Sequence, residues 1–364
     1  MPSASTLVSV HADQNIIFYS LVEGCISRQL IGYNDEVVDA TFLHSKEATN
    51  LLPHRDSHIA LATNSSLIRV YSMQDLDSRL LEGHSEIVLA LDHSANGFLL
   101  ASGSKDKTAR IWAPKTSETS STQAWGYSCV GICEGHAESI GAIAMAREGD
   151  ASKFMFTGSQ DRTIKMWDIS SVPSSSSENT PAKSIKTLTT QVAHDKDINS
   201  LDISPNDRFL ASGSQDRTAR VFEIQYIVGA AGVLRGELKH IGTCKGHKRG
   251  VWTVRFGRGE RVLATGSGDK TVKLWNLDDF SCLKTFEGHS NSVLRLNFLN
   301  ADMQLVSTAS DGLVKLWSIR EEECITTLDN HEDKVRSPSF LSLLNSYHVS
   351  IRSGPWLSAQ MSAQ

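Results

Sequence analysis

One segment recurs along the chain at a regular interval. Its fullest copy covers residues 100–112 and reads LASGSKDKTARIW. Strong copies end at Trp112, Trp167, Phe222, Trp275 and Trp317, a weaker copy ends at Tyr71, and a remnant ends at Tyr19. A fixed period of about 20–50 residues indicates a repeat architecture, in which each repeat is one supersecondary unit. We therefore expect one unit repeated along the chain, not one irregular core.

A histidine precedes each strong copy at a nearly constant distance. Gly-His pairs end at His84, His136, His247 and His289, and His194 follows an alanine. The interval from this histidine to the terminal aromatic residue is identical in four repeats, at 84–112, 194–222, 247–275 and 289–317, and slightly longer in the fifth, at 136–167. Independent loops would not keep that spacing, so the histidine and the aromatic residue belong to one unit.

Apolar and polar residues alternate within each repeat. After His289, three alternating runs cover 292–298, 304–309 and 313–317, and a fourth covers 324–328. Period-two alternation between Asp, Gly and Asn turns predicts short antiparallel strands. Four strands per unit of about 40–45 residues, with Gly-His and Trp markers, resemble WD repeats, which form the blades of β-propellers. The expected fold is therefore an all-β WD-repeat β-propeller.

The seven segment endings predict seven blades, one of them incomplete or composite. Residues 1–32 are expected to supply the outer part of the seventh blade, with 26–31 as its outermost strand. The propeller is thus assigned to residues 1–335. A Ser-rich stretch without the repeat pattern follows. Residues 336–364 are expected to be an irregular, disordered tail, or to contribute one improvised strand.

The resemblance to WD repeats implies a hydrogen-bonded set inside each blade, made by the Gly-His histidine, a Ser or Thr, the turn Asp and the terminal Trp. Because buried polar groups need partners, a complete chain of donors and acceptors would lock a blade. Three full sets are expected: His84, Ser102, Asp106 and Trp112; His136, Thr157, Asp161 and Trp167; and His247, Thr265, Asp269 and Trp275.

Two further blades depart from this pattern. The blade ending at Phe222 has no indole donor, so His194 and Asp216 are expected to make a weaker set. In the last strong copy, Gly312 directly follows Asp311, which is expected to shift the turn slightly.

A histidine paired with an aspartate could also orient a catalytic base. Here the pair recurs in every strong repeat, whereas an enzyme site is normally single, so we favour the structural interpretation. The Gly-rich segment 266–271 lacks the spacing of a phosphate loop. Cys129, Cys133 and His136 lack the paired CxxC knuckles of a zinc site. We therefore expect no enzyme activity, no cofactor, no metal and no small-molecule substrate.

Three consecutive connections to the next histidine are long: 112–136, 167–194 and 222–247. The corresponding connections 71–84, 275–289 and 317–331 are much shorter. We place the extra residues between the third and fourth strands, so that all three emerge on one face of the disc. Neighbouring insertions favour a partner-binding surface, although tolerated surface insertion is the alternative. Residues 225–234 are expected to form a short helix or a hydrophobic tab. The candidate contact residues are Trp125, Tyr127, Tyr226 and Ile227.

The opposite face is expected to carry a basic residue after each turn aspartate: Lys107, Arg162, Arg217 and Lys270. Such an arc could meet phosphate or an acidic peptide. The alternative is that a Lys or Arg here is common in WD repeats and that nearby acidic residues dilute the charge. With 36 basic and 41 acidic residues, the net charge of -5 predicts no whole-molecule attraction to nucleic acid.

Apolar runs, the first ten residues and the cysteines also indicate the cellular compartment. No run of eighteen apolar residues is present, so no membrane span is expected. Residues 1–10 lack the basic and apolar regions of a secretory signal. Six cysteines in a chain of this kind favour free thiols in a reducing compartment.

Several longer sequence segments are more specific than the Gly-His and Trp markers of the repeat. They include HDKDINS at 194–200, FSCLKTFEGH at 280–289 and SDGLVKLW at 310–317. Over about 25–335 the chain resembles the WD-repeat components of the U3 small nucleolar ribonucleoprotein in the small-subunit processome. That family implies tandem propellers and a helical C-terminal domain, of which this chain is expected to hold the second propeller without its last blade.

The resemblance also implies a nuclear, nucleolar scaffold in pre-ribosomal RNA processing. Its partners would be other proteins of a pre-ribosomal ribonucleoprotein complex, with contact to U3 small nucleolar RNA or pre-ribosomal RNA left open. The alternative function is a generic WD-repeat adaptor, such as a ubiquitin-ligase substrate receptor or a signalling scaffold.

Overall fold

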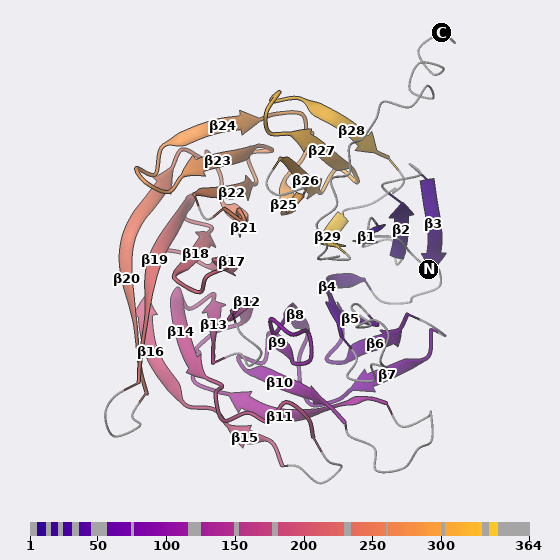
Figure 1. The fold of residues 1–364 in the computed structure, drawn as a ribbon, viewed down its shortest axis with the longest axis vertical. Helices are drawn as coiled ribbons and strands as arrows, with labels where there is room; N and C mark the ends of the chain where they lie inside the picture. Colours follow the sequence, from indigo (N-terminus) through magenta and orange to yellow (C-terminus); the bar gives the residue numbers. More distant parts are fainter. Residues whose placement is uncertain are drawn as a thin grey trace.

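In the part of the chain that the computed structural model describes, every regular element is a β-strand, and the strands form seven sheets around a central axis (Figure 1). This confirms the all-β, seven-bladed expectation. The described residues are 6–11, 16–20, 25–30, 36–44, 57–73, 76–115, 125–148, 153–176, 181–228, 234–259, 261–299, 303–329 and 335–340.

Each blade has four strands ordered from the axis to the rim. Blade one contains β4 (Val37–Leu43), β5 (His58–Thr63), β6 (Ile68–Ser72) and β7 (Ser78–Leu81). Blade two contains β8 (Val88–His93), β9 (Leu100–Ser104), β10 (Ala109–Pro114) and β11 (Tyr127–Cys133). Blade three contains β12 (Ile140–Met145), β13 (Phe154–Ser159), β14 (Thr163–Asp168) and β16 (Thr187–Val192).

The next three blades follow the same order. Blade four contains β17 (Ile198–Ile203), β18 (Phe209–Ser214), β19 (Thr218–Val228) and β20 (Leu234–Lys245). Blade five contains β21 (Val251–Phe256), β22 (Val262–Ser267), β23 (Val272–Asn276) and β24 (Cys282–Phe286). Blade six contains β25 (Val293–Leu299), β26 (Gln304–Ala309), β27 (Val314–Ser318) and β28 (Cys324–Leu328).

Blade seven is composite. It orders β29 (Val335–Phe340), β1 (Thr6–His11), β2 (Ile16–Ser20) and β3 (Cys25–Leu30) from the axis outward. β29 runs antiparallel to β1, with Leu7 opposite Phe340. Residues 336–340 are therefore not irregular: they belong to the one improvised strand that was the alternative expectation for the tail. Residues 341–364 lie outside the described residues.

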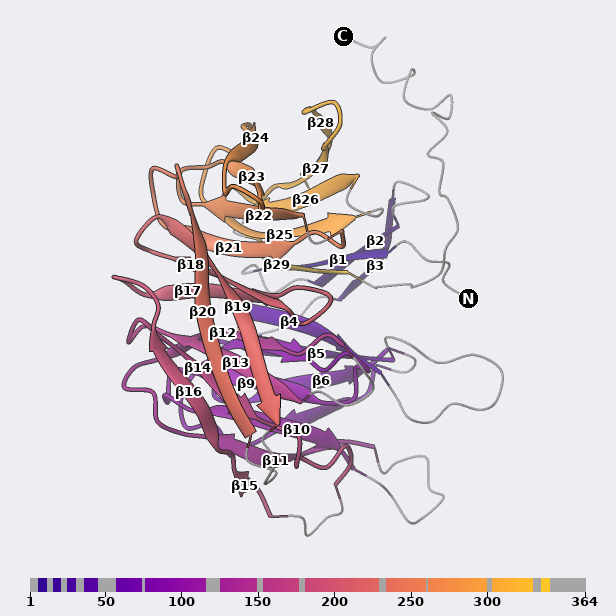
Figure 2. The same ribbon diagram turned by 60° about the vertical axis from the view of Figure 1, so that its left-hand side comes forward.

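The ring closes through its inner strands. Each inner strand contacts the inner strand of the next blade, and β29 contacts both β25 and β4. The hydrophobic core lies between neighbouring sheets: Trp167 of blade three, for example, packs in one cluster with Ile111 and Ala113 of blade two. Figure 2 shows the stacked sheets from the side, and the side chains between neighbouring sheets are buried.

The antiparallel strands divide the connections between two faces. Turns from second to third strand and links to the next blade lie on one face, which we name the turn face. It carries Lys107, Arg162, Arg217 and Lys270. The three long connections do lie between third and fourth strands, on the opposite face, which we name the insertion face.

The insertion of blade four forms no helix in its described part. Gln225 pairs with Glu237, and Val228 pairs with Leu234, so β19 and β20 continue the hairpin beyond the blade. The expectation of a short helix is wrong because these β-branched and aromatic residues pair as strands. The insertion of blade three adds β15 (Lys183–Ser184), which pairs in parallel with β11 of blade two.

Candidate functional site

The predicted polar set of blade two is present in full. His84 Nδ1 lies 2.7 Å from Asp106 Oδ2, and His84 Nε2 lies 2.8 Å from Ser102 Oγ. Trp112 Nε1 donates to the same Ser102 oxygen at 2.8 Å. Thr108 donates to Asp106 through its backbone N–H and its hydroxyl. The four side chains join strands β9 and β10 to the connection before β8 and to the β9–β10 turn, so they fix the blade.

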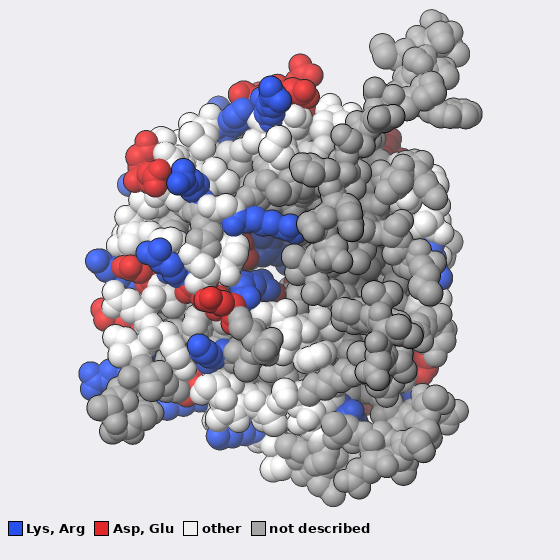
Figure 3. Space-filling view, in the orientation of Figure 1, with Lys and Arg blue, Asp and Glu red and all other residues white. Residues whose placement is uncertain are grey.

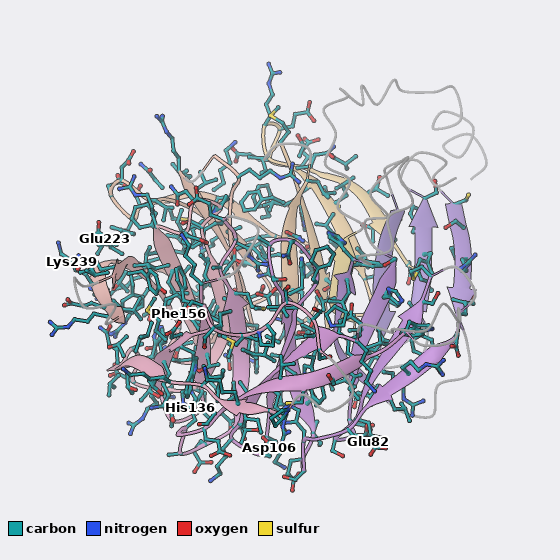
Figure 4. All side chains as sticks on the ribbon, turned by 60° about the horizontal axis from the view of Figure 1, so that its bottom comes forward. Glu82, Asp106, His136, Phe156, Glu223 and Lys239 are labelled. Carbon is teal, nitrogen blue, oxygen red and sulfur yellow. The ribbon has the colours of Figure 1, made fainter. Side chains whose placement is uncertain are left out.

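The other sets repeat this geometry. His136 and His247 each lie 2.7–2.9 Å from their aspartate and their threonine, and each indole N–H donates to that threonine at 2.8 Å. Blade six adds a fourth full set: His289, Ser307, Asp311 and Trp317. Figure 4 labels Asp106 and His136, which belong to successive blades. The repetition shows that these side chains do not converge on one cleft.

The proton positions in such a set follow from its donors. The Trp112 indole can only donate, so the Ser102 oxygen accepts and its own hydrogen is free for His84 Nε2. Nε2 is then an acceptor, and Nδ1–H donates to Asp106. Every hydrogen is used when the histidine is neutral. In agreement, burial lowers the pKa of His136 and of His289 despite the neighbouring carboxylates.

Of the two variant blades, the one with Phe222 has one hydrogen bond fewer, as expected, and the expectation of a shifted turn in the other needs correction. His194 lies 2.8 Å from Asp216 and 2.7 Å from Ser212, so the contacts that remain are as short as in the other blades. This set differs from the others only because Phe222 lacks the N–H donor of the tryptophan found there. In blade six, Gly312 has φ 81°, close to the 73° of Lys270, so the turn is not shifted.

The aspartates of these sets should make the fold sensitive to acid. Burial alone would raise the pKa of Asp161, but hydrogen bonds from Thr163 and His136 lower it to about 2. The pKa values of Asp106, Asp216, Asp269 and Asp311 are lowered in the same way. A folded carboxylate of lowered pKa stabilises the fold above its unfolded pKa, and this contribution is lost as pH falls towards the folded value.

We therefore expect the urea midpoint to decrease from pH 7 to pH 5, because burial lowers the pKa of His93, His136, His240 and His289 in the fold, so that their protonation favours the unfolded form. The decrease should steepen below about pH 4, where unfolded carboxylates take up protons first. Urea titrations at pH 7, 5, 4 and 3 test this. A midpoint that stays constant or rises between pH 5 and pH 3 would contradict the assigned pairs.

The four basic turn residues are all exposed, and all occupy the left-handed backbone region. Their φ values are 70°, 70°, 75° and 73° for Lys107, Arg162, Arg217 and Lys270. This backbone conformation costs free energy in residues that have a Cβ atom, whereas glycine adopts it without that cost. The chain places glycine there once, at Gly312.

We expect Lys107→Gly to stabilise the fold by about 0.5–1 kcal/mol, because strain relief exceeds the added backbone entropy of the unfolded chain. The reverse change, Gly312→Ala, should destabilise it by about 1 kcal/mol. Urea unfolding of both variants measures the difference. Equal stability of wild type and Gly312→Ala would show that the positive φ carries no strain.

The aromatic candidates on the insertion face pack mainly within the molecule. Tyr127 is 7% exposed in the cluster between blades one and two, so it is not available as a contact residue. Trp125 donates to Asp77 at 3.3 Å and lies 5.3 Å from the Arg79 guanidinium. It therefore joins the insertion to blade one.

The hairpin extension behaves similarly. Tyr226 lies 5.3 Å from Phe154, ring centre to ring centre, and so covers blade three. Ile227 is 54% exposed and is the one candidate of the four that stays open. Sequence reasoning thus located the insertions but did not separate their inward from their outward side chains.

A ring of charges around the axis was not anticipated. Asp92 accepts two hydrogen bonds from Arg147 at 3.1 Å. Asp202 accepts one from Arg255 at 3.1 Å, and the Arg147 guanidinium lies 3.8 Å from it. These pairs link the inner strands of blades two to five. The sequence signal was the aspartate at the same place in β8 and β17.

A further pair spans the composite blade. Arg295 of blade six lies 3.1 Å from Asp39 of blade one, and Asp39 also accepts the backbone N–H of Leu91 in blade two. Figure 3 shows Lys and Arg side chains bordering the central opening. The pair therefore connects the two blades that flank blade seven.

None of the six cysteines forms a disulfide bond. Among the described residues, no three His, Cys, Asp or Glu side chains group closely enough to hold a metal ion. In the same part of the chain, no helix has the length and apolarity needed to cross a membrane.

Comparison with known families agrees with this geometry. The profile of the family described as "WD domain, G-beta repeat" matches residues 77–113, 127–168, 183–223, 238–276 and 280–318. These ranges cover more than half of the chain, and each ends just after a terminal aromatic residue of the repeat. The chain belongs to the WD-repeat family.

Curated WD-repeat relatives narrow the comparison. The chain is 42% identical over 257 residues to transducin beta-like protein 3 of Mus musculus, covering 70% of this chain and 28% of that protein. It is 37% identical over 208 residues to U3 small nucleolar RNA-associated protein 13 of Saccharomyces cerevisiae, covering 54% of this chain and 23% of that protein. The chain thus spans about a quarter of the length of these relatives.

A more distant relative matches on repeat pattern. THO complex subunit 3 of Arabidopsis thaliana is 27% identical over 245 residues, covering 58% of this chain and 70% of that protein. The identity to transducin beta-like protein 3 and to U3 small nucleolar RNA-associated protein 13 is higher. This favours the resemblance that rests on segments such as 194–200 and 280–289.

Proposed function

We propose that this WD-repeat chain is a non-catalytic scaffold of the small-subunit processome that acts in pre-ribosomal RNA processing in the nucleus and nucleolus. Its partners would be other proteins of a pre-ribosomal ribonucleoprotein complex. The observation that carries the proposal is the similarity to two long WD-repeat proteins, one of which is U3 small nucleolar RNA-associated. Because only about a quarter of their length is covered, the activity of the whole relatives is part of the proposal.

The geometry supports a binding role. The histidine side chains of the five sets are 0–1% exposed, so a substrate cannot reach them. Their donors and acceptors are used within each blade. What the propeller offers to partners is surface: two faces, an outer rim and the mouth of the central channel.

Affinity purification of the tagged chain from nuclear extract, followed by RNA and protein identification, tests the proposal. We expect U3 RNA together with processome proteins. A parallel sample digested with nuclease should keep the protein partners that contact the propeller directly. Recovery of cullin-type ligase components without pre-ribosomal RNA would contradict the proposal and favour the adaptor alternative.

A further inference from the structure

Blade five presents an open indole at the turn-face mouth of the central channel. Trp252 is 36% exposed and follows directly after Val251, where the register of β21 against β22 shifts. The same bulge position in the other blades with described inner side chains holds smaller or aliphatic residues: Val38, Leu89, Gly141, Asn199 and Leu294. Among these six positions an aromatic ring occurs once.

A glycine in the neighbouring turn makes room for this ring. A Cβ built on Gly268 would lie 3.2 Å from Trp252 Nε1 and 3.4 Å from Arg249 Cβ. The indole and the arginine therefore meet at one turn. The residues that follow the end of the second strand in the other strong repeats all have side chains: Lys105, Gln160, Gln215 and Ser310.

Three cations lie on the same face of blade five as the indole. Lys248, Arg249 and Lys270 belong to the same blade and are exposed. The carboxylate that directly precedes Lys270, Asp269, already binds His247 and the backbone N–H of Lys248. Within the described part of the chain, none of the three cations makes a salt bridge.

The turn faces of blades three and four differ in charge from that of blade five. In blade three, Glu134 and Glu138 accompany Arg162, and in blade four Asp195 and Asp197 limit the positive surface. The patch of unpaired cations is thus centred on blade five. We name Trp252, Lys248, Arg249 and Lys270 the rim patch.

We propose that the rim patch binds single-stranded RNA, with one base stacked on Trp252 and the adjacent phosphates held by the three cations. Single-stranded nucleic acid is bound in general by aromatic rings that stack bases and by cations that follow the backbone. In a duplex the bases stack on one another, so no base face would be free to stack on the indole. The choice of RNA over DNA rests on the proposed function.

An acidic peptide could use the charges, but it would not use the ring in the same way. The rim patch combines one aromatic residue of β21 with cations of the preceding connection and of the β22–β23 turn. This combination matches the alternation of bases and phosphates along a nucleic-acid strand. Stacking on the indole is therefore the property that separates the two occupants.

Fluorescence anisotropy with a labelled ten-nucleotide oligouridine and the purified chain tests the proposal. We expect Trp252→Ala to weaken binding about tenfold, because loss of one stacked base costs roughly 5- to 150-fold. Trp252→Phe should retain most of the affinity. Leu89→Ala, at the same bulge position in blade two, is the matched control and should bind as wild type. Because Trp252 is partly exposed, melting curves of all three variants should overlap, and Trp252→Phe decides the result if Trp252→Ala melts early.

Gly268→Lys gives the sharpest contrast. It adds a positive charge, so binding by charge alone would become tighter. Its Cβ would press on the indole, so binding by stacking should become weaker. Lys270→Gln should lower the slope of log affinity against log salt by about 0.7, the loss of one phosphate contact to a single strand. Tighter binding by Gly268→Lys, unchanged binding by Trp252→Ala, or displacement of the RNA by an equal concentration of an oligoglutamate peptide would overturn the proposal.

The two proposals fail separately. If processome proteins co-purify but purified chain shows no Trp252-dependent RNA binding, the rim patch proposal is wrong and the scaffold proposal stands. If Trp252-dependent binding occurs but the chain recovers no pre-ribosomal components, the scaffold proposal is wrong. Equal affinity for the matching oligodeoxyuridine would overturn the choice of RNA over DNA.

Discussion

Trp275→Ala should destabilise the propeller by about 3–5 kcal/mol, the cost of removing a fully packed aromatic side chain. Trp275 is 1% exposed in the cluster between blades four and five. Its indole N–H donates to Thr265 at 2.8 Å, and the ring lies under Gly246. The substitution leaves a cavity and an incomplete polar set. Urea unfolding, followed by the fluorescence of the remaining tryptophans, measures the change.

The chain provides its own control for this variant. Phe222 stands at the equivalent place in blade four, where His194, Ser212 and Asp216 keep their mutual contacts. Trp275→Phe should therefore cost only about 1–2 kcal/mol, for one hydrogen bond and a small loss of volume. A melting curve of Trp275→Ala close to that of the wild type would refute the assignment of this residue to the blade core.

Asp202→Ala should destabilise the fold by about 2–3 kcal/mol, less than the roughly 3–5 kcal/mol that removing one partner of a fully buried pair costs. The Asp202 side chain is 9% exposed, accepts hydrogen bonds from Arg255 and from the backbone N–H of Phe256, and lies 3.8 Å from Arg147. We lower the figure because the two arginines are 24% and 31% exposed and keep part of their hydration. Urea unfolding measures the change.

Asp202→Asn separates charge from hydrogen bonding, because the amide oxygen can still accept from Phe256. It should cost less than Asp202→Ala. A double-mutant cycle with Arg255→Gln isolates the pair. If the cycle gives no coupling between positions 202 and 255, the charged ring does not hold the inner strands together.

Much of the fold follows from local spacing. The constant interval from histidine to terminal aromatic residue predicted the blades, because each blade is built from one continuous segment. The sets of His84, His136 and His247 were predictable from the resemblance to WD repeats, and all members of a set lie within a single repeat. The long connections were also placed correctly between third and fourth strands.

The candidate contact residues were less predictable. The sequence of the insertions does not indicate which side chains fold back, and Trp125, Tyr127 and Tyr226 all pack on the propeller. Trp252 was overlooked because one indole in an inner strand resembles a core residue. Its exposure results from the bulge in β21 and the room left by Gly268.

The sequence by itself determined the repeated unit, its strands and the polar set inside each blade, since those contacts form between residues near in the chain. Only the tertiary structure decided how the ring closes. β29 pairs with β1, and Arg295 reaches Asp39, so segments from opposite ends of the chain meet. No local pattern encodes these contacts, because they exist only after seven sheets have stacked around one axis and brought the two ends of the ring together.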